Sequence, residues 1–490
     1  YKVIPKGFFP QQDTGRIMGN IRADQSISFQ AMQEKLLKFM AIVQADPAVA
    51  AVNGFTGGSR RNSAVLFINL KPLSERKERA DQVIARLRGK LAHEPGANLF
   101  LNPVQDIRIG GRPSDSTYQF NLQADTLEDL RLWEPRIRRA MMQMEQITDV
   151  SSDLEDKGIQ TTVTIDRDAA AALGLNMRQI TTALNNAFGQ RVISTIYNPL
   201  NQYRVVLELA PEWLQGPETL RTFMLSTAGG AQVPLSRVAR FETTVAPLSV
   251  THVGGFPDAT ISFNLPIGVT LGQASEAILA KMAEIGAPTT LHGSFQGTAK
   301  AFKESMDSQP LLILAAIITI YLVLGMLYES LIHPITILST LPSAGVGALL
   351  ALMAFNVEFG IISLIGIILL IGIVKKNAIM MIDFAIDRQR RFGWSAGRAI
   401  FRAAQLRFRP IMMTTLAATA GAVPLALGSG EGAELRTPLG ISVVGGLLVS
   451  QVLTLFTTPV VYLLMDKLRT LPARIVKRRT PAPQLLEGTT

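Results

Sequence analysis

The chain has 490 residues, of which 48% are hydrophobic, 18% are charged and none is cysteine, and its net charge is +10. This length allows about two to four domains, and the absence of cysteine excludes disulfides and thiolate metal sites. Ordinary water-soluble sequence extends to residue 308, and long apolar runs follow between Leu311 and Met465, which indicates a soluble module joined to a membrane module.

The positive charge is confined to two short segments. Residues 387–409 hold seven Arg and one Asp, a balance of +6, and residues 466–490 hold six Lys or Arg and two carboxylates, a balance of +4. Their sum equals the net charge of +10. Because both segments flank apolar runs, they indicate cytoplasmic loops and no nucleic-acid partner.

Residues 1–14 are expected to be a link from an upstream membrane helix outside this sequence. The chain begins with Tyr1 and shows no signal-peptide pattern near its start. A large domain that crosses a membrane needs such a preceding segment. We therefore expect the chain to be a fragment.

Residues 15–112 are predicted to form a first subdomain. Two helices carry apolar stripes, one between Phe29 and Val43 and one between Val83 and Leu91. They alternate with strand-like segments at 15–23, 49–55, 64–70 and 98–104. The order β-α-β-β-α-β is that of a ferredoxin-like unit.

The segment from Gly54 to Asn62 joins two of these strands. It contains three glycines in nine residues, Gly54, Gly57 and Gly58. This composition predicts a mobile loop, with an ordinary flexible connection as the alternative. No helix N-terminus follows, so the GxxG spacing does not predict a phosphate site.

The same order of elements recurs in two pieces. Residues 113–167 supply strand 118–123, a helix and strand 147–154, and residues 248–308 supply strand 258–264, a helix and strand 290–296. Between them, residues 168–247 are predicted to form a separate insert. This insert has its own helix at 168–188 and a hairpin signal at Gly229–Gly230.

Residues 309–465 are predicted to be a membrane domain of five helices. About 20 apolar residues span the hydrocarbon core. Five runs approach this length: 311–328, 335–355, 361–386, 411–427 and 439–465. An odd number of spans places the two ends on opposite sides. With the basic loop 387–409 and a basic tail 466–490 in the cytoplasm, residues 1–308 lie outside it.

The third and fifth runs contain residues that contact with lipid does not require. Gly440, Gly445 and Gly446 permit close packing of helices. Lys376 lies roughly 22 Å from the outer end of its helix at 1.5 Å per residue. A lysine at that depth costs about 3 kcal/mol without an anionic partner or water, unless it snorkels to the surface. No carboxylate in the five runs matches its depth, so we expect the partner elsewhere.

No pattern suited to catalysis or metal binding is present. The four histidines are widely separated and have no metal-ligand spacing, and there is no GxSxG, Walker A or zincin motif. Met141, Met142 and Met144 could bind a soft metal, but they lie on one amphipathic helix, where filling a core is expected. The sequence therefore predicts neither an enzyme nor a metal site.

Four segments together resemble the C-terminal half of the AcrB-like multidrug exporters of the RND superfamily. Residues 371–379 read IGIVKKNAI and lead to Asp383, residues 407–414 read RFRPIMMT, residues 327–330 read LYES, and residues 231–236 read AQVPLS. The resemblance covers nearly the whole chain. Within the superfamily it is strongest to the MdtB and MdtC type, where a double lysine is also expected.

The resemblance implies a proton relay and no cofactor other than the proton gradient. The residues expected in the relay are Lys376, Asn377, Arg407 and Thr414. The acidic members of the relay sit in the N-terminal half of the family, outside this sequence. This matches the missing partner of Lys376.

The resemblance also implies that residues 15–112 and the second unit are periplasmic porter subdomains, with 168–247 as a docking insert. The substrate pocket and its switch loop are then expected at Gly54, Phe55, Gly57, Gly58, Arg60 and Phe67. The loop is one residue shorter than in the family and lacks a second Phe. Ala50 stands where the family has Phe.

The expected protein is an α+β membrane protein of the bacterial inner membrane with a large periplasmic domain. The resemblance implies proton-driven efflux of amphiphilic compounds through a tripartite complex. Its partners would be RND subunits in a homo- or heterotrimer, a periplasmic adaptor and an outer-membrane channel. Two alternatives stay open: an RND heavy-metal exporter, and a non-pumping RND-like export accessory or receptor.

Overall fold

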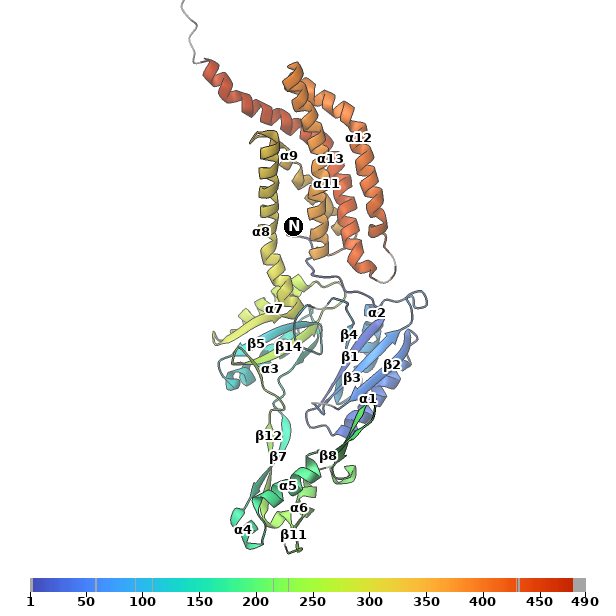
Figure 1. Cartoon of the computed structure of the whole chain (residues 1–490), viewed down its shortest axis with the longest axis vertical. Helices are drawn as coiled ribbons and strands as arrows, with labels where there is room; N and C mark the ends of the chain where they lie inside the picture. Colours follow the sequence, from blue (N-terminus) through green and yellow to red (C-terminus); the bar gives the residue numbers. More distant parts are fainter. Residues whose placement is uncertain are drawn as a thin grey trace, which may run out of the picture.

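The computed structural model describes residues 3–478 except 58, 59, 93, 108, 215, 228, 429 and 431. The molecule is elongated, with a helical bundle at one end, two sheet-and-helix units in the middle and a smaller insert at the far end (Figure 1). We call the two middle parts the first unit and the second unit, and the third part the insert.

The first unit has the predicted order of elements. It contains β1 (Arg16–Ala23), α1 (Phe29–Gln44), β2 (Val49–Thr56), β3 (Ser63–Leu70), α2 (Ala80–Leu91) and β4 (Ala97–Pro103). The strands form an antiparallel sheet in the order β2-β3-β1-β4. Both helices bury their apolar stripes against one face of this sheet, including Met32, Phe39 and Leu87. The other face stays open to the second unit.

The second unit is assembled from both sides of the insert. Before the insert come β5 (Tyr118–Ala124), α3 (Leu127–Met142) and β6 (Thr148–Ser152). After it come β13 (Thr251–Val253), β14 (Phe256–Asn264), α7 (Leu271–Ile285) and β15 (Leu291–Gln296). The sheet runs β13-β14-β5-β15, and β6 pairs with β14. Met141 and Met144 pack in its core, as expected, whereas Met142 is exposed.

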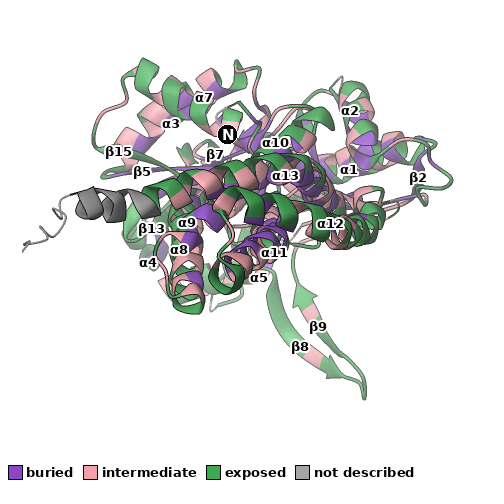
Figure 2. Cartoon of the chain, turned by 90° about the horizontal axis from the view of Figure 1, so that it is seen from above, coloured by how far each residue is buried: buried purple, intermediate pink, exposed green. Residues whose placement is uncertain are grey.

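The insert stands on a neck of two antiparallel strands, β7 (Gly158–Ile165) and β12 (Ala239–Ala246). Beyond the neck lie α4 (Arg167–Ala172), α5 (Met177–Phe188), α6 (Glu218–Thr222), β10 (Met224–Ser226) and β11 (Gln232–Pro234). A hairpin of β8 (Arg191–Tyr197) and β9 (Gln202–Leu207) projects away from the molecule (Figure 2).

The prediction of one helix over 168–188 was wrong, because the chain turns between α4 and α5. Gly174 adopts a positive φ of 76°, which a residue with a side chain rarely adopts. Asn176 then begins α5, and its side chain accepts a hydrogen bond from the backbone N–H of Gln179. The glycine and this cap together end one helix and start the next.

The bundle consists of α8 (Gly297–Tyr328), α9 (His333–Leu338), α10 (Leu341–Ala354), α11 (Ile361–Phe392), α12 (Ala396–Ala426) and α13 (Ala433–Arg478). Among the described residues, four helical stretches are long and apolar enough to cross a membrane: 297–328, 333–354, 361–392 and 433–468. The predicted fifth span lies in the second half of α12. It forms a helix there, but α12 is not among the four helical stretches that are apolar enough.

Three glycines of α13 allow the helices to pack closely. A Cβ atom at Gly440 would lie 2.2 Å from the backbone nitrogen of Ala426 in α12. At Gly445 it would lie 2.1 Å from the Cβ of Ala351 in α10, and at Gly446 2.1 Å from a methyl group of Leu370 in α11. The packing role expected for these glycines is therefore confirmed.

Candidate functional site

Lys376 lies in the middle of α11, within a stretch that is apolar enough to span a membrane. Its side chain is exposed, and among the described residues no carboxylate forms an ion pair with it. The next residue, Asn377, points in another direction and is buried. Successive residues of a helix differ by about 100° in direction, so one residue can line an open face while its neighbour faces the bundle.

Asn377 belongs to a buried hydrogen-bonded cluster that joins three helices. Its Nδ2 donates to Thr415 Oγ1 of α12 at 2.9 Å and to Gln451 Oε1 of α13 at 3.3 Å. Thr415 Oγ1 donates to the same Gln451 oxygen at 2.7 Å, and Gln451 Nε2 donates to Met412 Sδ at 3.3 Å. The cluster of Asn377, Thr415 and Gln451 thus ties α11, α12 and α13 together behind Lys376. We call it the amide cluster.

Arg407 and Thr414 do not reach this cluster. Thr414 Oγ1 donates to the Ile411 carbonyl of its own helix at 3.1 Å. The Arg407 guanidinium lies over the ring of Phe384, 5.4 Å from its centroid. Phe384 is eight residues after Lys376, or about 12 Å along a helix. Among the described residues, no hydrogen bond or ion pair joins Lys376, Arg407 and Thr414 to one another.

Two of the predicted pocket residues, Phe55 and Phe67, lie on the open face of the sheet of the first unit. Phe55 and Phe67 stack with their ring centroids 6.2 Å apart and are 55% and 47% exposed. Gly54 faces the other side, where a Cβ would lie 3.0 Å from Leu36 of α1. Gly57 has a φ of 99°, so the turn after β2 requires glycine. Gly58 lies outside the described residues.

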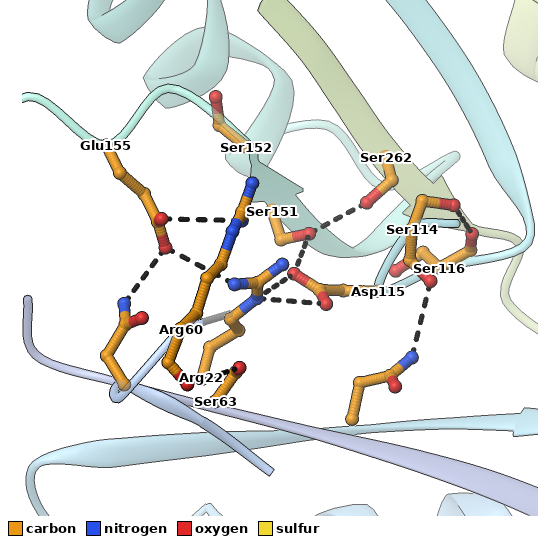
Figure 3. A network of polar contacts seen from close by, with 12 residues as sticks. Arg22, Arg60, Ser63, Ser114, Asp115, Ser116, Ser151, Ser152, Glu155 and Ser262 are labelled. Atoms are coloured by element: carbon orange, nitrogen blue, oxygen red, sulfur yellow. Dashed lines mark hydrogen bonds and ion pairs between the residues drawn. The ribbon is translucent and has the colours of Figure 1, made fainter. Parts of the chain in front are cut away.

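Arg60, at the end of the predicted loop, contacts the second unit (Figure 3). Its Nη1 lies 3.3 Å from Glu155 Oε2, and its Nη2 donates to Ser249 Oγ at 3.3 Å. Glu155 Oε1 also accepts from Asn62 Nδ2 at 2.9 Å and from Arg22 Nη1 at 3.3 Å. Sequence reasoning missed Glu155, Asn62 and Arg22. Their partners are far apart in the chain, and no local pattern marks them.

Arg22 also contacts Asp115 of the second unit. Its Nε lies 2.8 and 3.0 Å from the two carboxylate oxygens of Asp115. Arg22 and Phe67 share the open face of the sheet, because Arg22 pairs with Ser63 and Met18 pairs with Phe67 across β1 and β3. The exposed phenylalanines and the charged contacts therefore lie on the same surface, toward the second unit.

Two further carboxyl groups of the second unit lie near these contacts. Burial raises the pKa of Asp258, against hydrogen bonds from Asn121 and the nearby charge of Arg112, which lower it. Burial likewise raises the pKa of Asp153, against hydrogen bonds from Thr260 and the charges of Arg112 and Arg60. Several carboxyl groups of the second unit thus lie buried or half-buried near arginines of the first unit.

A cavity of about 530 Å³ lies where both units meet the first residues of α11 and α13. Its lining includes Phe8, Phe9, Tyr118, Ile362 and Glu358. Phe55 and Phe67 do not line it. The cavity thus combines aromatic and aliphatic walls with the Glu358 carboxylate.

Comparisons with known proteins place this arrangement in a family. The sequence model of the AcrB/AcrD/AcrF family matches residues 1–466. The multidrug resistance proteins MdtC of Yersinia pseudotuberculosis and Yersinia pestis are 61% identical over 469 residues, which cover 96% of this chain and 46% of those proteins. The chain thus spans about half the length of these relatives.

Solved structures share the fold. Two crystal forms of a heavy metal efflux pump match 95% of this chain and 49% and 48% of the pump, with TM-scores of 0.83 and 0.81 and identities of 24% and 23%. At these identities the likeness establishes the fold alone. Together with the family match over most of the chain, it shows that the chain belongs to the AcrB/AcrD/AcrF family, a family of transporters and not of enzymes.

Proposed function

We propose that this chain is part of a proton-driven exporter of amphiphilic compounds in the bacterial inner membrane. The observation that carries the proposal is the place of Lys376, which is exposed on the open side of α11, in the middle of an apolar helix. A charge in that position requires an anionic partner or water. A carboxylate pair supplied from outside the described residues would meet this requirement, and its protonation would release the lysine.

The amide cluster supports this proposal by fixing the direction of Lys376. Asn377 is held by Thr415 and Gln451, so α11 cannot rotate freely and turn Lys376 into lipid. The family resemblance adds Arg407 and Thr414 to the relay. In the conformation described they are apart from Lys376, so we propose that they join it in another step of the transport cycle.

The first test is drug efflux by the full-length protein in cells that lack other exporters. Lys376→Ala should reduce efflux to the level of cells without the protein, at unchanged expression. Lys376→Arg keeps the charge but cannot lose its proton, so it should also fail if the lysine takes part in proton transfer. Lys375→Ala, one position away, is the matched control and should transport. Full efflux by Lys376→Ala would show that this lysine is structural.

A second pair of variants separates relay from packing. Thr415→Val breaks the amide cluster and should lower the melting temperature of the purified protein. Thr414→Val removes a hydroxyl that bonds only within its own helix, so it should leave the melting temperature unchanged and reduce efflux. The opposite pattern would show that Thr415, and not Thr414, belongs to the relay.

The substrate class and the orientation rest on other features. The MdtC relatives are named multidrug resistance proteins, and the cavity above the membrane has the mixed apolar and acidic lining that suits cationic amphiphiles. We propose that both units are porter subdomains on the periplasmic side. Export of metal ions is the competing function, because the solved structures of similar fold are two crystal forms of a heavy metal efflux pump. Growth of the same cells on drugs and on toxic metals separates the two, and sensitivity to neither would favour a non-pumping role.

The β8–β9 hairpin supports assembly into a trimer. Among its residues, Ile196, Tyr197 and Tyr203 are exposed, and Leu200 at its tip is 93% exposed. An isolated hairpin with an apolar surface is only marginally stable in water. We propose that it packs against a neighbouring RND subunit, and that the insert docks an adaptor and an outer-membrane channel. Cross-linking from the hairpin in membranes should yield trimers, and a purely monomeric pattern would contradict this.

A further inference from the structure

The base of the neck, where the insert joins the second unit, contacts the predicted switch loop. Glu155 lies between β6 and β7, where the chain leaves the second unit for the insert. Ser249 lies just after β12, where the chain returns. The two residues pair as an isolated antiparallel bridge, and the Leu248 N–H donates to the Glu155 carbonyl at 2.8 Å. Glu155 is therefore part of the joint between the second unit and the insert.

The Glu155 side chain is occupied entirely by groups of the first unit. Its carboxylate accepts from Arg22 of β1 and from Asn62 of the loop, and it pairs with Arg60 of the loop. Its side chain is only 6% exposed, so these contacts replace water. Arg60 also donates to Ser249, so it touches both strands of the joint. Three parts of the molecule meet at this one carboxylate (Figure 3).

The contacts at this point differ in strength. Arg22 binds Asp115 through two oxygens at 2.8 and 3.0 Å and would hold β1 to the second unit even without Glu155. Within the described part of the chain, the Arg60 side chain contacts Glu155 and Ser249, both at 3.3 Å. Longer single contacts of this kind are weaker than short paired ones. The Arg60 guanidinium can therefore leave Glu155 while Asn62 keeps its 2.9 Å hydrogen bond and the two units stay attached.

We propose that Glu155 is a positioning residue that couples the loop residues 60–62 to the insert through Arg60. When Arg60 is bound, the loop is held down on the joint, and the two strands of the joint are bridged. When Arg60 leaves, the bridge is lost, and residues 60 and 61 and the neck gain freedom together. Movement of these loop residues, which follow Phe55 in the chain, is then linked to movement of the insert.

The coupling can be measured as a distance in the full-length protein. This chain contains no cysteine, so spin labels at Arg61→Cys on the loop and Val245→Cys on β12 form a unique pair within it. Both positions are exposed. The unmodified background should give one narrow distance distribution. Because a hydrogen bond to a charged group contributes about tenfold or more to an equilibrium, Glu155→Gln should reduce the docked population by about that factor.

Two further variants serve as a control and as an independent test of the distance measurement. Glu242→Gln removes a carboxylate from the exposed side of β12 and should leave the distribution unchanged. Arg60→Gln breaks the same contact from the loop side and serves if Glu155→Gln does not fold. The double variant should be no broader than either single variant, because both act through one contact. A distribution unchanged by Glu155→Gln and by Arg60→Gln, or effects that add in the double variant, would overturn the proposal.

A transport assay supplies the second readout. Since the loop is expected to act during the cycle, Glu155→Gln should change the maximal rate of efflux more than the drug concentration at half-maximal rate. Glu155→Asp keeps the charge with a shorter reach and should restore part of the rate. A lower melting temperature with an unchanged rate per folded protein would contradict the coupling. This consequence rests on the proposed efflux function, whereas the distance measurement does not, so failure of one is distinguishable from failure of the other.

Discussion

The amide cluster in the helices and the charged contacts around Glu155 both hold parts of the molecule together, but with different chemistry. Each joins three parts of the molecule through one buried group. Among the helices the group is the neutral amide of Gln451, whereas between the units it is a carboxylate with two arginines. Charges are costly in a hydrocarbon environment but tolerable where water lies nearby.

The difference indicates which of the two clusters is expected to stay closed. The amide cluster has neutral hydrogen bonds of 2.7, 2.9 and 3.3 Å between buried side chains. The charged joint keeps Arg22 and Arg60 partly exposed, at 23% and 28% of their side-chain surface, so water can replace each contact as it opens. A fixed helix packing and a movable loop are the expected consequences.

The largest effect is expected from placing a charge in the amide cluster. Gln451→Glu should destabilise the bundle by about 3 kcal/mol, the cost of a carboxylate in the middle of a membrane helix. Gln451→Leu removes the same hydrogen bonds without a charge and should cost about 1 kcal/mol. Unfolding of the purified full-length protein measures both. Equal stability of the two variants would show that water reaches Gln451, and the contrast between the two joints would fail.

An intermediate effect is expected at the charged joint. Arg22→Gln leaves Asp115 without its cation and should cost about 1–3 kcal/mol. Arg16→Gln on the same strand is the matched control, because its pair with Asp106 is exposed and 3.5 Å long, and such pairs contribute about 0–1 kcal/mol. Thermal unfolding of the full-length protein gives both values. If the control costs as much as Arg22→Gln, burial of the joint contributes nothing.

The smallest effect concerns pH. Burial raises the pKa of Asp258, so the folded protein binds this proton more tightly than the unfolded chain does. The contribution to stability is therefore full below the unfolded pKa and is lost as the pH rises through the folded pKa. Asp258→Asn removes this loss, so the variant should gain melting temperature relative to wild type as the pH rises from about 3.5 to 7. A constant difference across that range would contradict the raised pKa.

Local patterns predicted most of the elements. A helix can be recognised from the pattern of about 10 to 20 neighbouring residues, because its hydrogen bonds and apolar face lie along one segment. This applies to the apolar stripes of α1 and α2 and to the long apolar runs of α8, α11 and α13. The packing glycines of α13 were recognisable for the same reason. The break between α4 and α5 was missed, although Gly174 and Asn176 form a local signal for a helix end and a new start.

The sequence by itself determined the membrane module, the order of elements in both units and the family, since each depends on composition, periodicity or motifs in short segments. Only the tertiary structure decided which side chains meet. Thr415 and not its neighbour Thr414 reaches Asn377, because about 100° of helix rotation separates the two directions. Glu155 meets Asn62 across 93 positions and Arg22 across 133. Such contacts depend on how whole units pack, and no pattern within one segment encodes them.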